Sequence, residues 1–252
     1  MRALIRVRKY DTTAMTPTAT TPASLLNRHY RLVWWGVLML LWVPASSLLR
    51  DYLNDDLGVN ALETLQRTTG RWAVIALILT LAVTPTRRAL VRLCRLAKRR
   101  WGRRLSDWNT LMRMRRMLGL SCFAYAALHA GVYLAFDLSW DWAFLADDAT
   151  EKPYILAGAL NLFLLALLAA TSPDRIRHAL KGWWRRIHRL VYVIALLAIA
   201  HWVWMLKPGD GRATPYLAAL LALLGIRLLY RVGWMTLGED DGMPAMPRPP
   251  QG

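Results

Sequence analysis

The apolar residues of this 252-residue chain fall into six long runs that short polar stretches separate. The runs are almost uniformly apolar, a pattern typical of helices inside a membrane and not of one-sided helices on a soluble domain. They cover Leu32–Leu49, Trp72–Val83, Met117–Leu138, Tyr154–Ala170, Ile187–Leu206 and Tyr216–Tyr230. The pattern predicts an all-α fold, a polytopic bundle of six transmembrane helices.

The second run is the weakest prediction, because it has only twelve residues and a helix needs about 20 to span a bilayer. By length alone it could be re-entrant or interfacial. The connections after the second and fourth runs are rich in Arg and Lys, whereas those after the first and third are acidic. If the second run did not cross, acidic and basic loops would share one side. The positive-inside rule therefore predicts that it crosses and that both termini are cytoplasmic.

Composition supports a membrane protein and excludes other classes. The chain is 56% hydrophobic with a formal net charge of +17, and its basic residues cluster between apolar runs. That clustering favours contact with membrane lipids and argues against a nucleic-acid partner. Residues 1–28 and 233–252 are polar or rich in Pro and Gly, so we expect disordered cytoplasmic tails around a membrane domain at 29–232. No cleavable signal peptide is predicted.

Two histidines lie deep in the predicted spans. His129 comes thirteen residues after Arg116 and His201 twelve after Arg189, on two helices that run in the same direction. At about 1.5 Å per residue both lie roughly 20 Å from the cytoplasmic edge. Paired imidazoles at one depth are typical of axial haem ligands. The alternative is that each is a core histidine that donates to a carbonyl of a neighbouring helix.

His188 lies at the basic entrance of the fifth run, at the level of Arg115 and Arg116. Position alone leaves open whether it is a ligand or a solvated histidine at the interface. Thirteen residues separate it from His201, so the two side chains would point roughly 140° apart on one ideal helix. Cys94 and Cys122 fall in a basic loop and in a span, which suggests neither a disulfide nor a thiolate metal site.

With these residues in view, the sequence resembles the MsrQ (YedZ) family, within the ferric-reductase-like transmembrane group. The resemblance runs from about Asn60 to Tyr230. It rests on the stretches Thr68–Trp72, Leu81–Pro85, Arg115–Leu120, Tyr125–His129, Lys152–Tyr154, Leu190–Tyr192 and His201–Trp204.

The resemblance implies an inner-membrane protein of bacteria that binds one or two b-type haems and FMN. By position, His129, His188 and His201 match the family's haem-linked histidines. Wider relatives have another histidine where this chain has Arg115, which makes Arg115 a candidate contact to a cytoplasmic-side cofactor. The implied electron donor is quinol, and the implied partner is MsrP, a periplasmic molybdenum-cofactor reductase that repairs oxidised methionines.

This reading predicts an electron-transfer subunit without its own site for methionine sulfoxide. No stretch marks an FMN site, and no glycine fingerprint of a dinucleotide-binding domain is present. The acidic loop from Asp137 to Lys152, with Trp140 and Trp142, is expected either to contact the partner or to anchor helix ends. Alternatives are a related cytochrome with another acceptor, or a non-redox transporter or assembly protein whose histidines are structural.

Overall fold

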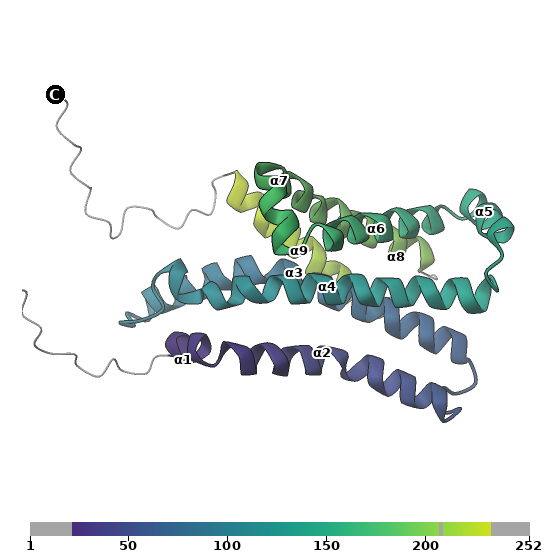
Figure 1. Ribbon diagram of the computed structural model, residues 1–252, viewed down its shortest axis with the longest axis horizontal. Helices are drawn as coiled ribbons and strands as arrows, with labels where there is room; N and C mark the ends of the chain where they lie inside the picture. The colour runs from purple at the N-terminus through teal and green to yellow at the C-terminus, as the bar shows by residue number, and fades with distance from the viewer. Residues whose placement is uncertain (1–21, 207–208, 233–252) are drawn as a thin grey trace, which may run out of the picture.

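A computed structural model describes residues 22–206 and 209–232, and in these ranges the chain is helical without strands. The elements are α1 (Pro22–Arg28), α2 (Tyr30–Leu53), α3 (Ala61–Leu96), the short helix η1 (Leu105–Trp108), α4 (Asn109–Val132), the π-helical turn η2 (Tyr133–Asp137), α5 (Trp142–Glu151), α6 (Pro153–Ala170), α7 (Asp174–Ile187), the 3₁₀ turn η3 (His188–Leu190), α8 (Val191–Met205), the short turn η4 (Gly211–Ala213) and α9 (Thr214–Arg231). The long helices lie side by side along one axis (Figure 1).

Among the described residues, six helical stretches are long and apolar enough to cross a membrane, which confirms the predicted bundle of six spans. The doubtful second run is the middle of α3, a helix of 36 residues. At about 1.5 Å per residue this helix is roughly 54 Å long, more than a bilayer core requires. Asn60 caps its start, because its side chain accepts a hydrogen bond from the Glu63 backbone at 3.1 Å. The protein is therefore a multi-pass membrane protein.

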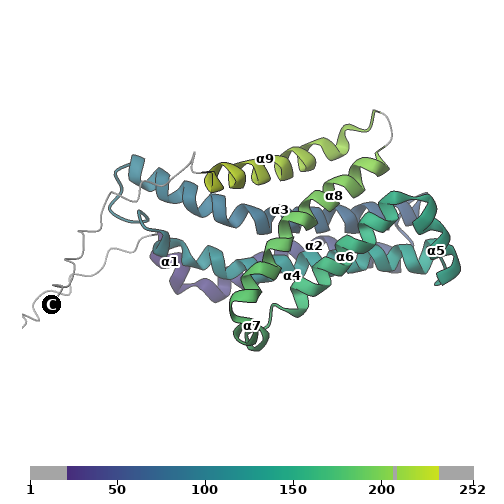
Figure 2. The same cartoon turned by 90° about the horizontal axis from the view of Figure 1, so that it is seen from above.

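The bundle is built around the antiparallel pair α3 and α4, which pack together most extensively. Helix α6 packs on α8, α9 covers α3, and α2 flanks α3 and α4 (Figures 1 and 2). In the core, the Tyr125 ring stacks between those of Trp42 and Trp72. Its hydroxyl donates to the carbonyl of Leu41 at 2.8 Å, so one buried side chain of α4 fixes the neighbouring α2.

The expected N-terminal tail, 1–28, includes one element. Pro22–Arg28 form the short helix α1, which is joined to the start of α4 because the Thr110 hydroxyl donates to the side chain of Asn27. Residues 1–21 and the expected tail at 233–252 lie outside the described residues. The division into tails and a membrane domain at 29–232 therefore stays a prediction.

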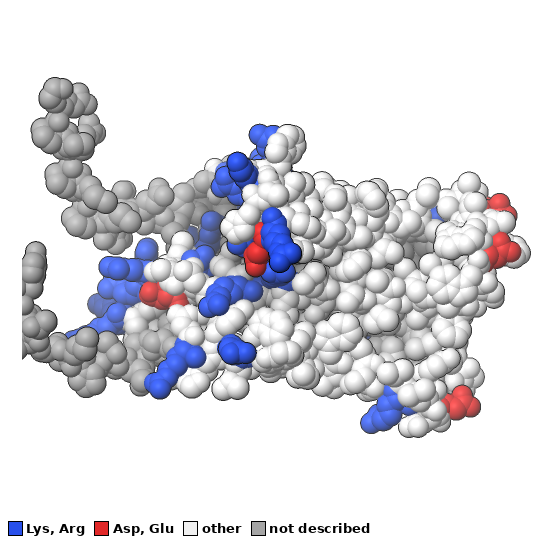
Figure 3. Space-filling view, viewed as in Figure 1, with Lys and Arg blue, Asp and Glu red and all other residues white. Residues whose placement is uncertain are grey.

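Charged side chains gather at the two ends of the bundle. Figure 3 shows most of the Lys and Arg toward the end where α1 and α7 lie, with a few Asp and Glu among them. Asp and Glu lie at the opposite end, including beside α5, together with a few Lys or Arg, and a largely uncharged band separates the two ends. Within that band large apolar side chains of α2 such as Met39, Leu40 and Val43 are exposed. Exposed apolar side chains between two charged ends are typical of a surface that faces lipid.

Candidate functional site: a pair of facing histidines

The structure brings His129 of α4 and His201 of α8 together. Their ring centroids lie 6.2 Å apart and the ring planes are perpendicular. Helices α4 and α8 have few direct backbone contacts, because each packs on α6 instead. The two imidazoles are therefore close together although their helices hardly pack on each other.

His129 is oriented by α3. Its Nδ1 atom lies 3.0 Å from the backbone carbonyl oxygen of Gln66. A carbonyl can only accept, so Nδ1 carries the proton and donates, which leaves the Nε2 lone pair free. Gly70, one helical turn beyond Gln66, lets the ring lie against the α3 backbone. Helix α3 thus determines both the tautomer and the direction of this imidazole.

His201 is oriented in the same way by α6. Its Nδ1 donates to the carbonyl oxygen of Tyr154 at 2.7 Å, and its ring lies against Gly158, again one turn further along. Both histidines therefore do what the core-histidine alternative requires, since each donates to a neighbouring helix. That bond uses one ring nitrogen only. Among the described residues neither Nε2 atom has a hydrogen-bond partner, so both are free to bind a ligand.

The donor set fits a haem better than a bare metal ion. The described residues contain no cluster of three or more His, Cys, Asp or Glu side chains that could hold a metal alone. A haem needs only two axial protein ligands. Two imidazoles that each bind a metal at about 2 Å have ring centroids roughly 6 Å apart, close to the observed spacing. The side-chain oxygen of Asn161, three residues after Gly158, is buried without a partner, as expected beside a cofactor.

His188 lies at the other end of α6. Its ring packs on Trp184 with centroids 4.2 Å apart, and its Nε2 lies 3.3 Å from the hydroxyl oxygen of Thr171, the residue that ends α6. The 140° separation from His201 assumed one continuous helix. Turn η3 breaks that helix at His188, and so both histidines reach α6, near its two ends.

Arg115 of α4 lies near a second arginine rather than a carboxylate. It interacts electrostatically with Arg227 of α9 and with Tyr192 of α8. Arg227 donates to the Tyr192 hydroxyl at 2.8 Å and to the Leu81 carbonyl at 2.6 Å, while its Nε is buried without a partner. These bonds hold Arg227 inside the bundle, so it does not extend to the membrane surface. Sequence reasoning missed Tyr192, because nothing in its local sequence indicates this contact.

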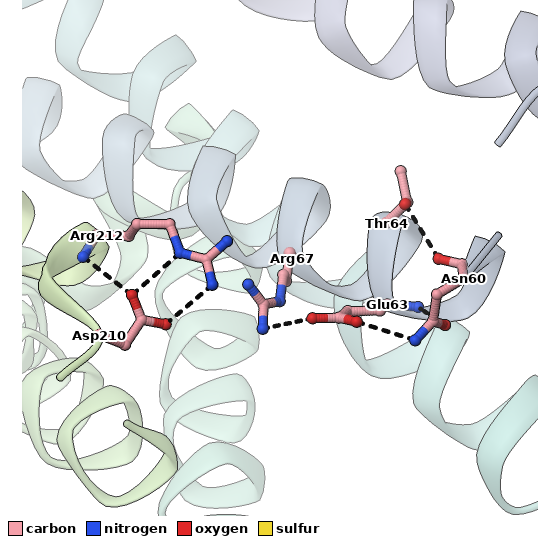
Figure 4. A network of polar contacts seen from close by, with 6 residues as sticks. All are labelled: Asn60, Glu63, Thr64, Arg67, Asp210 and Arg212. Atoms are coloured by element: carbon pink, nitrogen blue, oxygen red, sulfur yellow. Dashed lines mark hydrogen bonds and ion pairs between the residues drawn. The ribbon is translucent and has the colours of Figure 1, made fainter. Parts of the chain in front are cut away.

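Polar contacts fix the helix ends near His129. Figure 4 shows Arg67 paired with Glu63 on the first turns of α3, beside Arg212 paired with Asp210 at the start of α9. The hydrogen bonds from Arg212 hold the pKa of the Asp210 carboxyl below its usual range, so it stays ionised. The pair of Glu63 and Arg67 lies within one turn of Gln66, whose carbonyl orients His129.

A second contact joins α5 to the end of α4. Lys152 donates to Asp148 at 2.6 Å, and the Tyr133 hydroxyl donates to the same carboxylate at 2.5 Å. These bonds, that of Lys152 foremost, hold the pKa of Asp148 below its usual range. Tyr133 lies one turn beyond His129, so the ionised carboxylate ties the acidic loop to the helix that carries this histidine.

Comparisons with known proteins agree with the geometry. The ferric reductase like transmembrane component family matches residues 69–199, which include His129 and His188, while His201 lies two residues beyond the match. Curated relatives named protein-methionine-sulfoxide reductase heme-binding subunit MsrQ include those of Azospira oryzae, 36% identical over 78% of both chains, and Herminiimonas arsenicoxydans, 38% identical over 76% of this chain and 80% of the relative. The MsrQ of Ralstonia nicotianae is 36% identical over 88% of this chain and 94% of its own. The chain therefore belongs to the MsrQ family of ferric-reductase-like transmembrane proteins.

Proposed function

We propose that this protein is a membrane cytochrome that takes electrons from the quinone pool and gives them to a periplasmic methionine sulfoxide reductase, MsrP. The observation that carries the proposal is the pair His129 and His201, which face each other with both Nε2 atoms free. The names of the relatives support it, since each is called a heme-binding subunit of such a reductase.

In this proposal His129 and His201 are the axial ligands of a b-type haem. The haem supplies a one-electron carrier inside the membrane, and the protein supplies binding and orientation. Gln66 and Tyr154 hold each imidazole in the tautomer that leaves Nε2 unprotonated, and their hydrogen bonds make the imidazoles more basic. The bundle keeps water away from this region, because Tyr125, one turn before His129 on α4, and Ile194, two turns before His201 on α8, are almost completely buried.

We assign His188 and Arg115 to a second cofactor contact, nearer the basic end of the bundle. The support is an excess of positive charge: Arg115 and Arg227 approach each other, and no ion pair among the described residues provides either with a carboxylate. Two arginines inside a bundle call for an anion, and a haem propionate has the required charge. If that cofactor is a haem, the protein binds two haems in all. FMN remains a prediction from the resemblance, without assigned residues.

The direction of transfer follows from the distribution of charge. We place the protein in the bacterial inner membrane with both termini in the cytoplasm, because the basic end of the bundle then faces inward. The pair of histidines lies toward the acidic end, where the side chains of Trp140, just before α5, and of Trp142 and Phe144, on its first turn, are exposed. We propose this rim as the contact for MsrP, which itself carries the site for methionine sulfoxide. Exposed aromatics alternate with Asp137, Asp141 and Asp147 there, so a basic partner surface fits.

The proposal is tested in sealed vesicles of both orientations, with the protein reduced by a soluble quinol. Oxidised MsrP and methionine sulfoxide are then added outside, and haem oxidation is followed by absorbance. We expect oxidation only where the acidic face is outside. The matched control is the His129→Ala variant, which should lose the haem of the His129–His201 pair and should therefore not pass electrons to MsrP. Oxidation only from the basic face would reverse the direction, and none from either face would exclude this acceptor.

A further inference from the structure

We propose that Gly70 and Gly158 are positioning residues for the two histidines, forming two matching backbone seats, Gln66–Gly70 on α3 and Tyr154–Gly158 on α6. The inference rests on the proposed haem ligation and extends it to residues that touch no cofactor. In each seat a histidine from another helix donates its Nδ1 proton to the first residue's carbonyl while its ring lies on the glycine.

The available space is the first argument. A Cβ atom on Gly70 would lie 3.1 Å from both Cε1 and Nδ1 of His129. A Cβ on Gly158 would lie 2.9 Å from Cε1 and 3.0 Å from Nδ1 of His201. Carbon atoms in van der Waals contact are normally about 3.5–4.0 Å apart. Because each ring is held by its hydrogen bond, even a methyl group would force the imidazole or the helix to move.

The two seats also have the same construction. In each, the accepting carbonyl belongs to the residue four positions before the glycine, which is the spacing of one α-helical hydrogen bond. Each ring therefore lies over a single helical turn. Other helical glycines are different: Gly36, Gly131 and Gly225 have nothing within 4 Å of an added Cβ. Gly70 and Gly158 are thus packed tightly against a candidate ligand, whereas the other three glycines have open space beside them.

The seats have a chemical consequence. A hydrogen bond from Nδ1 to a carbonyl fixes the tautomer and makes Nε2 a stronger donor to iron. A stronger donor stabilises the ferric state, so it lowers the reduction potential of the haem. Displacing either ring from its carbonyl should weaken haem binding and raise the potential. If the glycines only allowed close helix packing, replacing them would not be expected to raise the reduction potential at both sites.

The test compares Gly70→Ala and Gly158→Ala with Gly131→Ala and Gly225→Ala in the purified, full-length protein. Three quantities are measured: haem content, the reduction midpoint, and the electron paramagnetic resonance of the ferric haem. We expect haem affinity to fall roughly 10- to 100-fold in each seat variant, with a midpoint shifted to more positive values and an altered ferric spectrum. The two controls should match the unmodified protein. Seat variants with unchanged midpoint and spectrum would overturn the proposal.

A second measurement leaves both glycines unchanged and separates this inference from the proposed function. In haem-free protein labelled with ¹⁵N-histidine, nitrogen resonances should show Nδ1-protonated tautomers for His129 and His201, identified by their loss in His129→Ala and His201→Ala. Nε2-protonated tautomers would overturn the seats, even if haem is bound. If the seats are seen but the purified protein binds no haem, the proposed function fails and the structural inference stands.

Discussion

At the scale of single residues, the candidate site consists of two histidines inside the membrane and the backbone carbonyls that orient them. His129 and His201 were predicted to be at one depth, because counting from the basic helix ends requires only the rise per residue. Their partners Gln66 and Tyr154 could not be predicted, since a backbone carbonyl has no sequence signature. The matching glycines four residues later were visible in the sequence, but their meaning depends on which helices become neighbours.

His188 provides the residue-scale prediction. Replacing it with Ala should leave the haem of the His129–His201 pair in place, because His188 contacts Thr171 at the opposite end of α6. Haem per protein, measured by the pyridine haemochrome assay, should therefore stay at or above one half of the unmodified value. The exposed His178 serves as the control, since His178→Ala should change nothing. Complete loss of haem in His188→Ala, with the protein still folded, would contradict two separate sites.

At the scale of helices, the sequence predicted the number of elements better than their ends. The apolar run of α3 covers only a third of the helix, because its charged turns extend into the interface where side chains such as Arg71 can reach water. The break at η3 was not predicted, since no Pro or Gly marks it. It arises where Trp184 and His188 converge on the end of α6, a tertiary contact.

The contact of α2 with the bundle can be measured through Tyr125. Tyr125→Phe removes the hydrogen bond to the Leu41 carbonyl and keeps the stacked ring. We expect the free energy of unfolding to fall by about 0.6 kcal/mol and by no more than roughly 1.7 kcal/mol, as for other hydrogen bonds within membranes. Reversible unfolding in mixed micelles gives the value. Tyr216→Phe is the matched control, because this ring stacks on Trp202 without a hydroxyl bond; an equal loss there would contradict the account.

At the scale of the whole molecule, the charge pattern and the fold agree. Alternating acidic and basic connections, read from the sequence, lie at opposite ends of the bundle, with an uncharged band between them (Figure 3). The distribution was predictable because the positive-inside rule concerns charge counts rather than packing. The approach of Arg115 to Arg227 could not be predicted, since these residues lie on helices that are far apart in the sequence.

Topology is tested with a reporter that is active only in the periplasm. We expect activity when it is fused at Asp147 in the acidic connection, and none at Arg100 in the basic connection or after Gly238. The physical reason is that α3 and α4 both cross, which puts these connections on opposite sides. A cytoplasm-specific reporter at the same three positions is the control and should give the reverse pattern. Activity of the periplasmic reporter at Arg100 but not at Asp147 would show that α3 does not cross.

The central claim is that His129 and His201 together bind a haem, and the most direct measurement is the reduced-minus-oxidised absorption spectrum of the purified protein. The unmodified protein should show a b-type haem that dithionite reduces. His129→Ala and His201→Ala should each remove most of that absorbance, because either change leaves the iron with one axial ligand. The exposed His29 is the control, and His29→Ala should retain the full spectrum. Full haem retention in both single variants of the pair would contradict the account.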